Sequence, residues 1–177
     1  MTARHTIRDA TEQDAPPIAS IYGHYVLTSP ATFEEIPPSS EEIASRMAQI
    51  VRAGLPWRVA VDPDGTLLGY AYASLYRTRS AYRYTLENSV YIAPAAARQD
   101  IGAALMRDVI ERCVSLGYRQ MLAVIGDSAN SASIGLHAHL GFAMIGTHPA
   151  IGFKFGRWID VVHMQLALGD GSFTPPR

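Results

Sequence analysis

Glu87-Asn88-Ser89-Val90-Tyr91-Ile92 is followed after a short loop by Ile101-Gly102-Ala103-Ala104-Leu105, and this stretch decides the fold of the chain. The first segment is typical of a β-strand, and the second is typical of a helix start with small residues in its first turn. Such a turn presents unpaired N–H groups and the positive end of the helix dipole, so a diphosphate could bind there. Many α/β proteins use the same turn only to pack a helix closely, so this stretch alone leaves both interpretations open.

The rest of the chain predicts further strands and helices on both sides of this unit. Strands are expected at residues 5–9, 57–61, 67–75, 84–92, 121–125, 143–147 and 160–166, and helices at 11–28, 39–54, 101–116 and 130–140. The order βαα, ββ, βα, βα, ββ predicts an α/β (α+β) fold with a mixed sheet and helices on both faces. Residues 1–168 are expected to form a single domain, and the Gly- and Pro-rich tail, residues 169–177, is expected to be disordered.

Composition narrows the possible partners and the location. The chain has 177 residues and a formal net charge of -1, which favours neither nucleic acid nor an anionic membrane as a partner. No apolar stretch is long enough for a transmembrane helix, and residues 1–13 are too polar for a signal peptide, so a cytoplasmic location is expected. The single cysteine, Cys113, lies among apolar residues of an expected helix and is predicted to be a core residue.

Five segments resemble the GNAT superfamily of N-acetyltransferases, and in particular its phosphinothricin acetyltransferase branch. They are Glu87–Tyr91, Ala123–Asp127, Ser131–His137, Leu140–Phe142 and Lys154–Val162, and the similarity extends from Ile7 to Leu166. The resemblance implies the GNAT fold, with a central twisted mixed sheet, and acetyl-CoA as co-substrate. It also implies direct acetyl transfer to the α-amine of a small amino acid such as phosphinothricin, methionine sulfoximine or methionine sulfone. The alternatives are an acetyltransferase that acts on another small amine or on a protein N-terminus, and a catalytically weak protein that binds coenzyme A.

The resemblance also assigns residues to the co-substrate. It implies that the pantetheine arm lies along Val90, Tyr91 and Ile92, that Asn130 approaches it from the next helix, and that the diphosphate meets the turn Arg98-Gln99-Asp100-Ile101-Gly102-Ala103. Family members usually carry Arg or Gln, two variable residues, Gly, one variable residue, and Gly or Ala across this turn. Here Ala97 and Asp100 replace the Arg or Gln and the first Gly. We expect Asp100 to lie at the helix N-cap, to compete for the N–H groups there, and to weaken coenzyme A binding.

Two residues are expected to carry the chemistry. The resemblance makes Glu87 the base that deprotonates the acceptor amine through a water molecule, and His137 the acid that protonates the leaving thiolate. Without the resemblance, Glu87 would be interpreted as a surface charge on a strand, and His137 as a helix histidine with a satisfied hydrogen bond. A backbone N–H between Ser89 and Tyr91 is the natural donor to the developing oxyanion.

The acceptor is expected to meet arginines and aromatic residues. The resemblance makes Arg77, Arg79 and Tyr82 a clamp for an anionic amino acid, with Phe33 closing the site from the loop between the first two helices. A solvated arginine loop is the alternative. No metal is expected, because His137 and His139 are two residues apart on a helix and point in different directions. The resemblance also implies a homodimer built partly by the strand region from Trp158 to Leu166.

Overall fold

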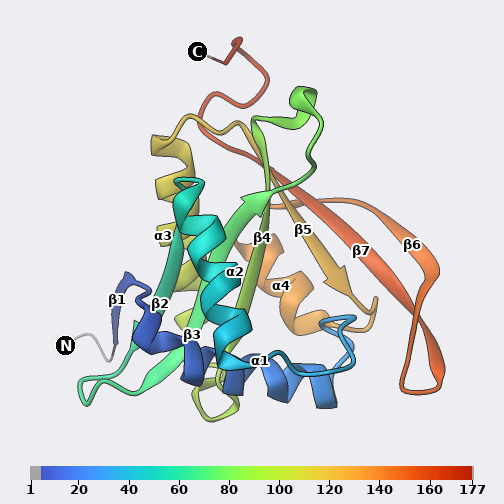
Figure 1. Cartoon of the computed structure of the whole chain (residues 1–177). Coiled ribbons are helices and arrows are strands. Elements are labelled where there is room, and N and C mark those ends of the chain that lie inside the picture. The colour runs from blue at the N-terminus through green and yellow to red at the C-terminus, as the bar shows by residue number, and fades with distance from the viewer. Residues whose placement is uncertain (1–4, 177) are drawn as a thin grey trace.

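The computed structural model describes residues 5–176, which form a seven-stranded sheet with helices on both faces (Figure 1). The strands are β1 (Thr6–Asp9), β2 (Trp57–Val61), β3 (Leu67–Leu75), β4 (Thr85–Ile92), β5 (Gln120–Gly126), β6 (Ala143–Lys154) and β7 (Arg157–Ala167). They lie in the order β1-β2-β3-β4-β5-β7-β6. Every neighbouring pair is antiparallel except β4 and β5, which are parallel. This confirms the predicted mixed sheet.

The helices divide between the two faces of the sheet. They are α1 (Ala15–Thr28), α2 (Ser40–Arg52), α3 (Ile101–Ser115) and α4 (Ser131–His139), with short 3-10 turns η1 (Glu12–Asp14), η2 (Ser80–Tyr82) and η3 (Pro94–Ala96). Val59 belongs to the core formed with α1 and α2, whereas the next residue, Ala60, belongs to the core formed with α3. Successive residues of a strand point to opposite faces, so one strand supplies both cores.

The strands β4 and β5 separate part-way along their length. Only residues 85–88 of β4 pair with residues 120–123 of β5, although β4 continues to Ile92 and β5 to Gly126. The Ala93 N–H bonds to the Leu68 carbonyl on β3. Alternate residues of an antiparallel strand bond to the same neighbour, so the backbone groups of Val90 and Ile92 face away from β3 and toward the gap. The gap therefore has a strand edge as one wall.

Three expected boundaries, the end of β6, the start of β7 and the start of α1, were wrong for physical reasons. The strands β6 and β7 were predicted to be short, but they form one long hairpin that turns at Phe155 and Gly156. The register of this hairpin shifts at residues 144–146 and 148–152, which breaks the alternation on which a sequence prediction depends. The first helix begins at Ala15 rather than Thr11, because residues 12–14 form a 3-10 turn in which Asp14 Oδ2 accepts from the Thr11 N–H.

The segment that follows β7 contacts the rest of the domain through Arg119. The Arg119 guanidinium donates to the carbonyl oxygens of Gly171 and Pro175 in this segment. The expected disorder of residues 169–177 stays a prediction. Within residues 5–176, no helix has both the length and the apolar character needed to cross a bilayer.

Candidate active site

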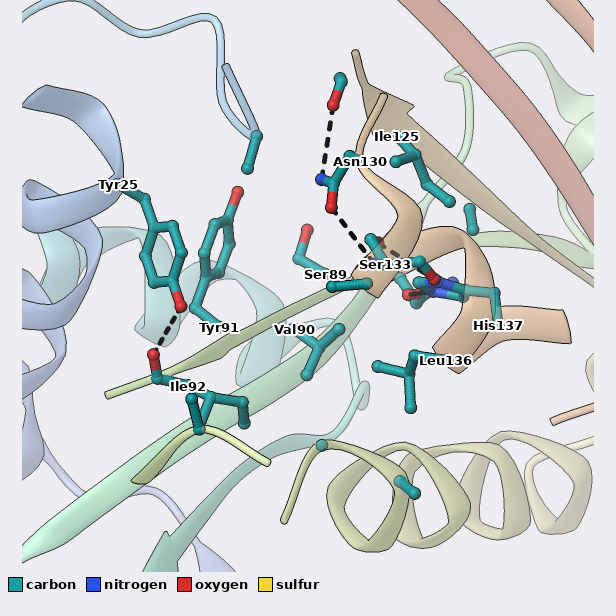
Figure 2. A pocket seen from close by; sticks show the side chains of 18 of the residues that line it. Tyr25, Ser89, Val90, Tyr91, Ile92, Ile125, Asn130, Ser133, Leu136 and His137 are labelled. Carbon is teal, nitrogen blue, oxygen red and sulfur yellow. Dashed lines mark hydrogen bonds between the residues drawn. The ribbon is translucent and has the colours of Figure 1, made fainter. Parts of the chain in front are cut away.

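A cleft of about 850 Å³ opens where β4 and β5 separate. Its walls come from the second half of β4, the turn that leads into α3, the end of β5, α4, and the loop that follows α1. Figure 2 shows Val90 on β4 and Leu136 on α4 directed toward each other across this space. The parallel pairing of β4 with β5 ends at Asn88 and Ala123, so the cleft is a direct consequence of the sheet geometry.

The wall formed by β4 offers backbone groups to an extended ligand. The Val90 N–H and C=O and the Ile92 N–H face the cleft, whereas the Ile92 carbonyl accepts a hydrogen bond of 2.6 Å from the Tyr25 hydroxyl (Figure 2). Val90, Tyr91 and Ile92, which the resemblance assigns to the pantetheine arm, all line the cleft, and their contact with the co-substrate stays a prediction. Asn130 also lines it, but its side chain caps α4 by accepting from the Ser133 N–H at 3.2 Å.

The turn before α3 has an unusual backbone. Arg98 and Asp100 have φ angles of 60° and 59°, in the left-handed region that glycine prefers. Asp100 is the N-cap of α3, as expected, and its positive φ is one that glycine adopts without strain. The predicted competition was wrong, because the Asp100 side chain makes no hydrogen bond to the helix. A capping side chain needs an extended backbone at the N-cap, and Asp100 does not have one.

The first turn of α3 lies close to the opposite wall. Gly102 faces α4 and β4: a Cβ atom there would lie 3.3 Å from Leu136 Cδ2 and 3.7 Å from Ile92 Cγ1. The whole turn predicted from the sequence, residues 98–103, lines the cleft. A helix start with free N–H groups next to an open strand edge fits the diphosphate and the amide-bearing arm of acetyl-CoA. The residues present therefore fit this co-substrate.

Glu87 on β4 and His137 on α4 both line the cleft, and they lie on opposite sides of β4. Glu87 is half-buried and shares a face of β4 with Tyr91, which packs edge-on against Tyr22 of α1. Burial raises the pKa of the Glu87 carboxyl above its ordinary value. Its neighbour Asn88 points to the other face, where it contacts His137. The structure thus brings both predicted catalytic residues to one cleft and separates them by the thickness of the strand.

Hydrogen bonds occupy both ring nitrogens of His137. Nδ1 lies 2.8 Å from the Ser133 carbonyl oxygen, and Nε2 lies 3.0 Å from Asn88 Oδ1. The ring is buried and packs edge-on against Phe142, with the ring centres 5.0 Å apart. Burial lowers the pKa of His137, and the hydrogen bond to the Ser133 carbonyl acts in the opposite direction. The sequence singled out this histidine but gave no indication of Asn88 as its partner.

The loop after α1 closes one end of the cleft with Phe33. Cβ atoms added to Gly152 and Gly126 would lie 2.2 Å and 3.3 Å from the Phe33 ring, so this ring needs glycine beside it. Lys154, which is buried, donates to the Ser29 and Thr32 carbonyls of the same loop at 3.0 Å and 2.8 Å. The sequence predicted Phe33 but missed Lys154, because only the tertiary structure brings the β6–β7 hairpin to this loop.

The arginine clamp does not share this cleft in the structure. Arg77, Arg79 and Tyr82 lie in the exposed segment between β3 and β4, outside the cleft lining. The Arg77 guanidinium lies 5.1 Å and 5.9 Å from the ring centres of Tyr76 and Tyr82. Phe33 lines the cleft and this segment does not, and the role of the segment in acceptor binding stays a prediction.

Comparison with known proteins identifies the architecture. Residues 7–163 match the family model described as an acetyltransferase (GNAT) domain. The chain belongs to this family. It is 52% identical to a phosphinothricin N-acetyltransferase of Alcaligenes faecalis, over 97% of this chain and 86% of the relative. It is 40% identical to an L-methionine sulfoximine/L-methionine sulfone acetyltransferase of Pseudomonas aeruginosa, over 96% and 98% of the two chains.

A solved GNAT structure has the same fold. The phosphinothricin acetyltransferase of Sinorhizobium meliloti, determined in complex with acetyl-CoA, superposes with a TM-score of 0.95 at 46% identity. The match covers 99% of this chain and 94% of that one.

In this GNAT acetyltransferase, Cys113 takes no part in the cleft. It lies on the buried side of α3, in the core, as predicted, and burial raises the pKa of its thiol to about 12. A thiolate, the nucleophilic form, is therefore strongly disfavoured there.

Within residues 5–176, no group of three or more His, Cys, Asp or Glu side chains is arranged to hold a metal ion.

Proposed function

We propose that this chain transfers the acetyl group of acetyl-CoA directly to the α-amine of a small amino acid that has a tetrahedral anionic or oxidised-sulfur side group. Phosphinothricin, methionine sulfoximine and methionine sulfone are the acceptors that its relatives' names suggest. The observation that carries the proposal is the cleft itself, where an open strand edge and a helix N-terminus adjoin a half-buried glutamate.

Glu87 is the proposed base. An α-amine with a pKa near 8 is mostly protonated at neutral pH, and only its neutral form attacks the acetyl carbon. A raised pKa makes Glu87 a better proton acceptor than an exposed glutamate, and a positioned base contributes about 10²- to 10⁴-fold in rate. The route through a water molecule allows Glu87 to act without direct contact with the amine.

Val90 and His137 are the proposed partners of the thioester. The Val90 N–H faces the cleft and can donate to the carbonyl oxygen as negative charge develops on it. His137 is the proposed proton donor to the leaving thiolate. The buried Cys113 thiol supports transfer without an acyl-enzyme, because it lies outside the cleft lining and its thiolate is disfavoured.

The first test is calorimetric titration of acetyl-CoA into the protein, followed by a panel of acceptor amines. We expect micromolar binding and acetylation of methionine sulfone, methionine sulfoximine and phosphinothricin ahead of their unoxidised or uncharged analogues. Absence of binding at millimolar acetyl-CoA would favour a scaffold that has lost its co-substrate. Faster acetylation of peptide N-termini than of every free amino acid would replace the proposed acceptor class.

The assembly and location are further parts of the proposal. A homodimer built partly by the strand region from Trp158 to Leu166 is supported by the apolar surface of the adjoining hairpin, where Ile151, Phe153, Phe155 and Trp158 are all more than half exposed. Sedimentation that shows only monomer at micromolar concentration would refute the dimer. We propose a cytoplasmic location, and fractionation of cells that produce the chain tests it.

A further inference from the structure

Asn88 links three elements at the point where β4 and β5 separate. Its side chain is buried on β4, with its Nδ2 donating to the Leu122 carbonyl of β5 at 2.9 Å and its Oδ1 facing His137 Nε2 of α4 at 3.0 Å. The backbone pairing of β4 with β5 ends at Asn88 itself. The Asn88 amide therefore occupies the inner end of the cleft, between the strands and the histidine.

Three hydrogen-bond contacts run in a row from the Leu122 carbonyl to the Asn88 amide, from there to the His137 ring, and from the ring to the Ser133 carbonyl. Each contact requires one hydrogen. The carbonyl oxygens at the two ends of the row can only accept. Between them, the Asn88 amide donates in one direction and accepts in the other, and the imidazole connects Asn88 to Ser133. Three contacts need three hydrogens, but the amide and a neutral imidazole supply only two. The Ser133 hydroxyl, the other donor near the ring, lies 3.5 Å from Nδ1, whereas the Ser133 carbonyl oxygen lies at 2.8 Å and is the closer partner.

Exchanging the amide O and N positions of Asn88 does not remove this shortage. With Nδ2 turned toward a neutral ring, Oδ1 would face the Leu122 carbonyl, and two acceptors would oppose each other. A proton on each ring nitrogen satisfies all three contacts at once. An unsatisfied buried polar group is costly, so the arrangement favours the cationic ring.

We propose that Asn88 is a positioning residue that favours the imidazolium form of His137 and holds its Nε2–H at the inner end of the cleft. This inference rests on the proposed role of His137 as proton donor. Only the imidazolium can give a proton to a leaving thiolate and remain a stable neutral ring. After that transfer one contact of the row is lost, and it is restored when the ring takes up a proton from solvent. Asn88 thus opposes the effect of burial, which favours the neutral ring.

Other charged groups are not hydrogen-bonded to this ring. The ionisable side chains that line the same cleft are Glu87 on β4, Arg98 and Asp100 before α3, and His139 on α4, besides two tyrosines. His139 accepts from Arg107 instead, at 3.1 Å, and Phe142 covers one side of the His137 ring. In the described part of the chain, the hydrogen-bond partners of His137 are Asn88 and Ser133 alone.

The experiment compares the His137 pKa, measured by NMR titration of the ring, in the unmodified protein, Asn88→Leu and Asn88→Asp. Both substitutions keep the approximate shape of the side chain. Leucine removes both the acceptor that faces His137 and the donor to the Leu122 carbonyl, whereas aspartate loses only the donor. We expect the pKa of His137 to fall by about one pH unit or more in Asn88→Leu and to rise in Asn88→Asp. An unchanged or raised His137 pKa in Asn88→Leu would overturn the proposal.

Two further readouts keep the inference separate from the proposed function. If Asn88→Leu does not fold, the unmodified protein decides: both ring hydrogens of protonated His137 should exchange slowly with water, and rapid exchange of the Nε2 hydrogen overturns the proposal. In kinetic assays, Asn88→Leu should move the alkaline limb of kcat to lower pH and leave the acid limb, assigned to Glu87, in place. A His137 pKa that shifts as expected while kcat keeps its alkaline limb would contradict the acid role of His137 and leave the Asn88 inference standing.

Discussion

Replacing Asp100 tests how the turn before α3 meets a diphosphate. Asp100 lies at the N-cap with a left-handed backbone and an exposed side chain that makes no capping bond, so its charge rather than its hydrogen bonding opposes the ligand. Two unit charges about 6 Å apart in water repel by about 0.7 kcal/mol, which corresponds to about a threefold change in Kd. Asparagine tolerates the same backbone without the charge, and glycine also relieves the left-handed geometry.

We therefore expect Asp100→Asn to bind acetyl-CoA about threefold more tightly, and Asp100→Gly to bind at least as tightly as Asp100→Asn. Calorimetric titration at low and high ionic strength measures both variants beside the unmodified protein. Salt screens exposed charges, so the gain in Asp100→Asn should shrink at high salt. A gain that persists undiminished in high salt, or an affinity that does not change in either variant, would refute the electrostatic explanation.

Three other perturbations address the remaining walls of the cleft. Glu87→Gln should lower kcat by about 10²- to 10⁴-fold. Because burial raises the pKa of Glu87, its carboxylate forms only as pH rises, so the activity of the unmodified enzyme should increase with pH through that pKa. A Glu87→Gln variant that keeps this acid limb in its pH profile would contradict the assignment of Glu87 as the base. Gly102→Val places methyl groups against Leu136 and Ile92 at the start of α3. It should weaken acetyl-CoA binding by more than about tenfold, about 1.4 kcal/mol, with little loss of thermal stability. Unchanged tight binding in calorimetry would exclude a close approach of acetyl-CoA to the backbone of Gly102. Lys154→Met removes two hydrogen bonds to the loop that carries Phe33, so it should lower the free energy of unfolding by about 1–3 kcal/mol, measured by denaturant unfolding. It should also raise KM for the acceptor more than KM for acetyl-CoA in steady-state kinetics. An unaltered acceptor KM would argue against this loop as a wall of the acceptor site.

Local pattern was sufficient for most of the sheet. The boundaries of β2 and β3 match the prediction to the residue. Pro63 and Gly65, in the tight turn between the two strands, mark where β2 ends and β3 begins. The hairpin of β6 and β7 was predicted less well, since its bulges break the alternation and Gly152 is dictated by the Phe33 ring that packs against it. A contact between segments so far apart in the chain leaves no periodic signal in either one.

The sequence by itself determined the succession of strands and helices along the chain and the family resemblance, because these depend on residue types at short spacing. Only the tertiary structure showed that Asp100 leaves the helix N–H groups free, that Arg77 and Arg79 lie outside the cleft, and that Asn88 connects His137 to β5. Side-chain direction and long-range hydrogen bonds depend on backbone angles and on packing between elements, which no local pattern specifies.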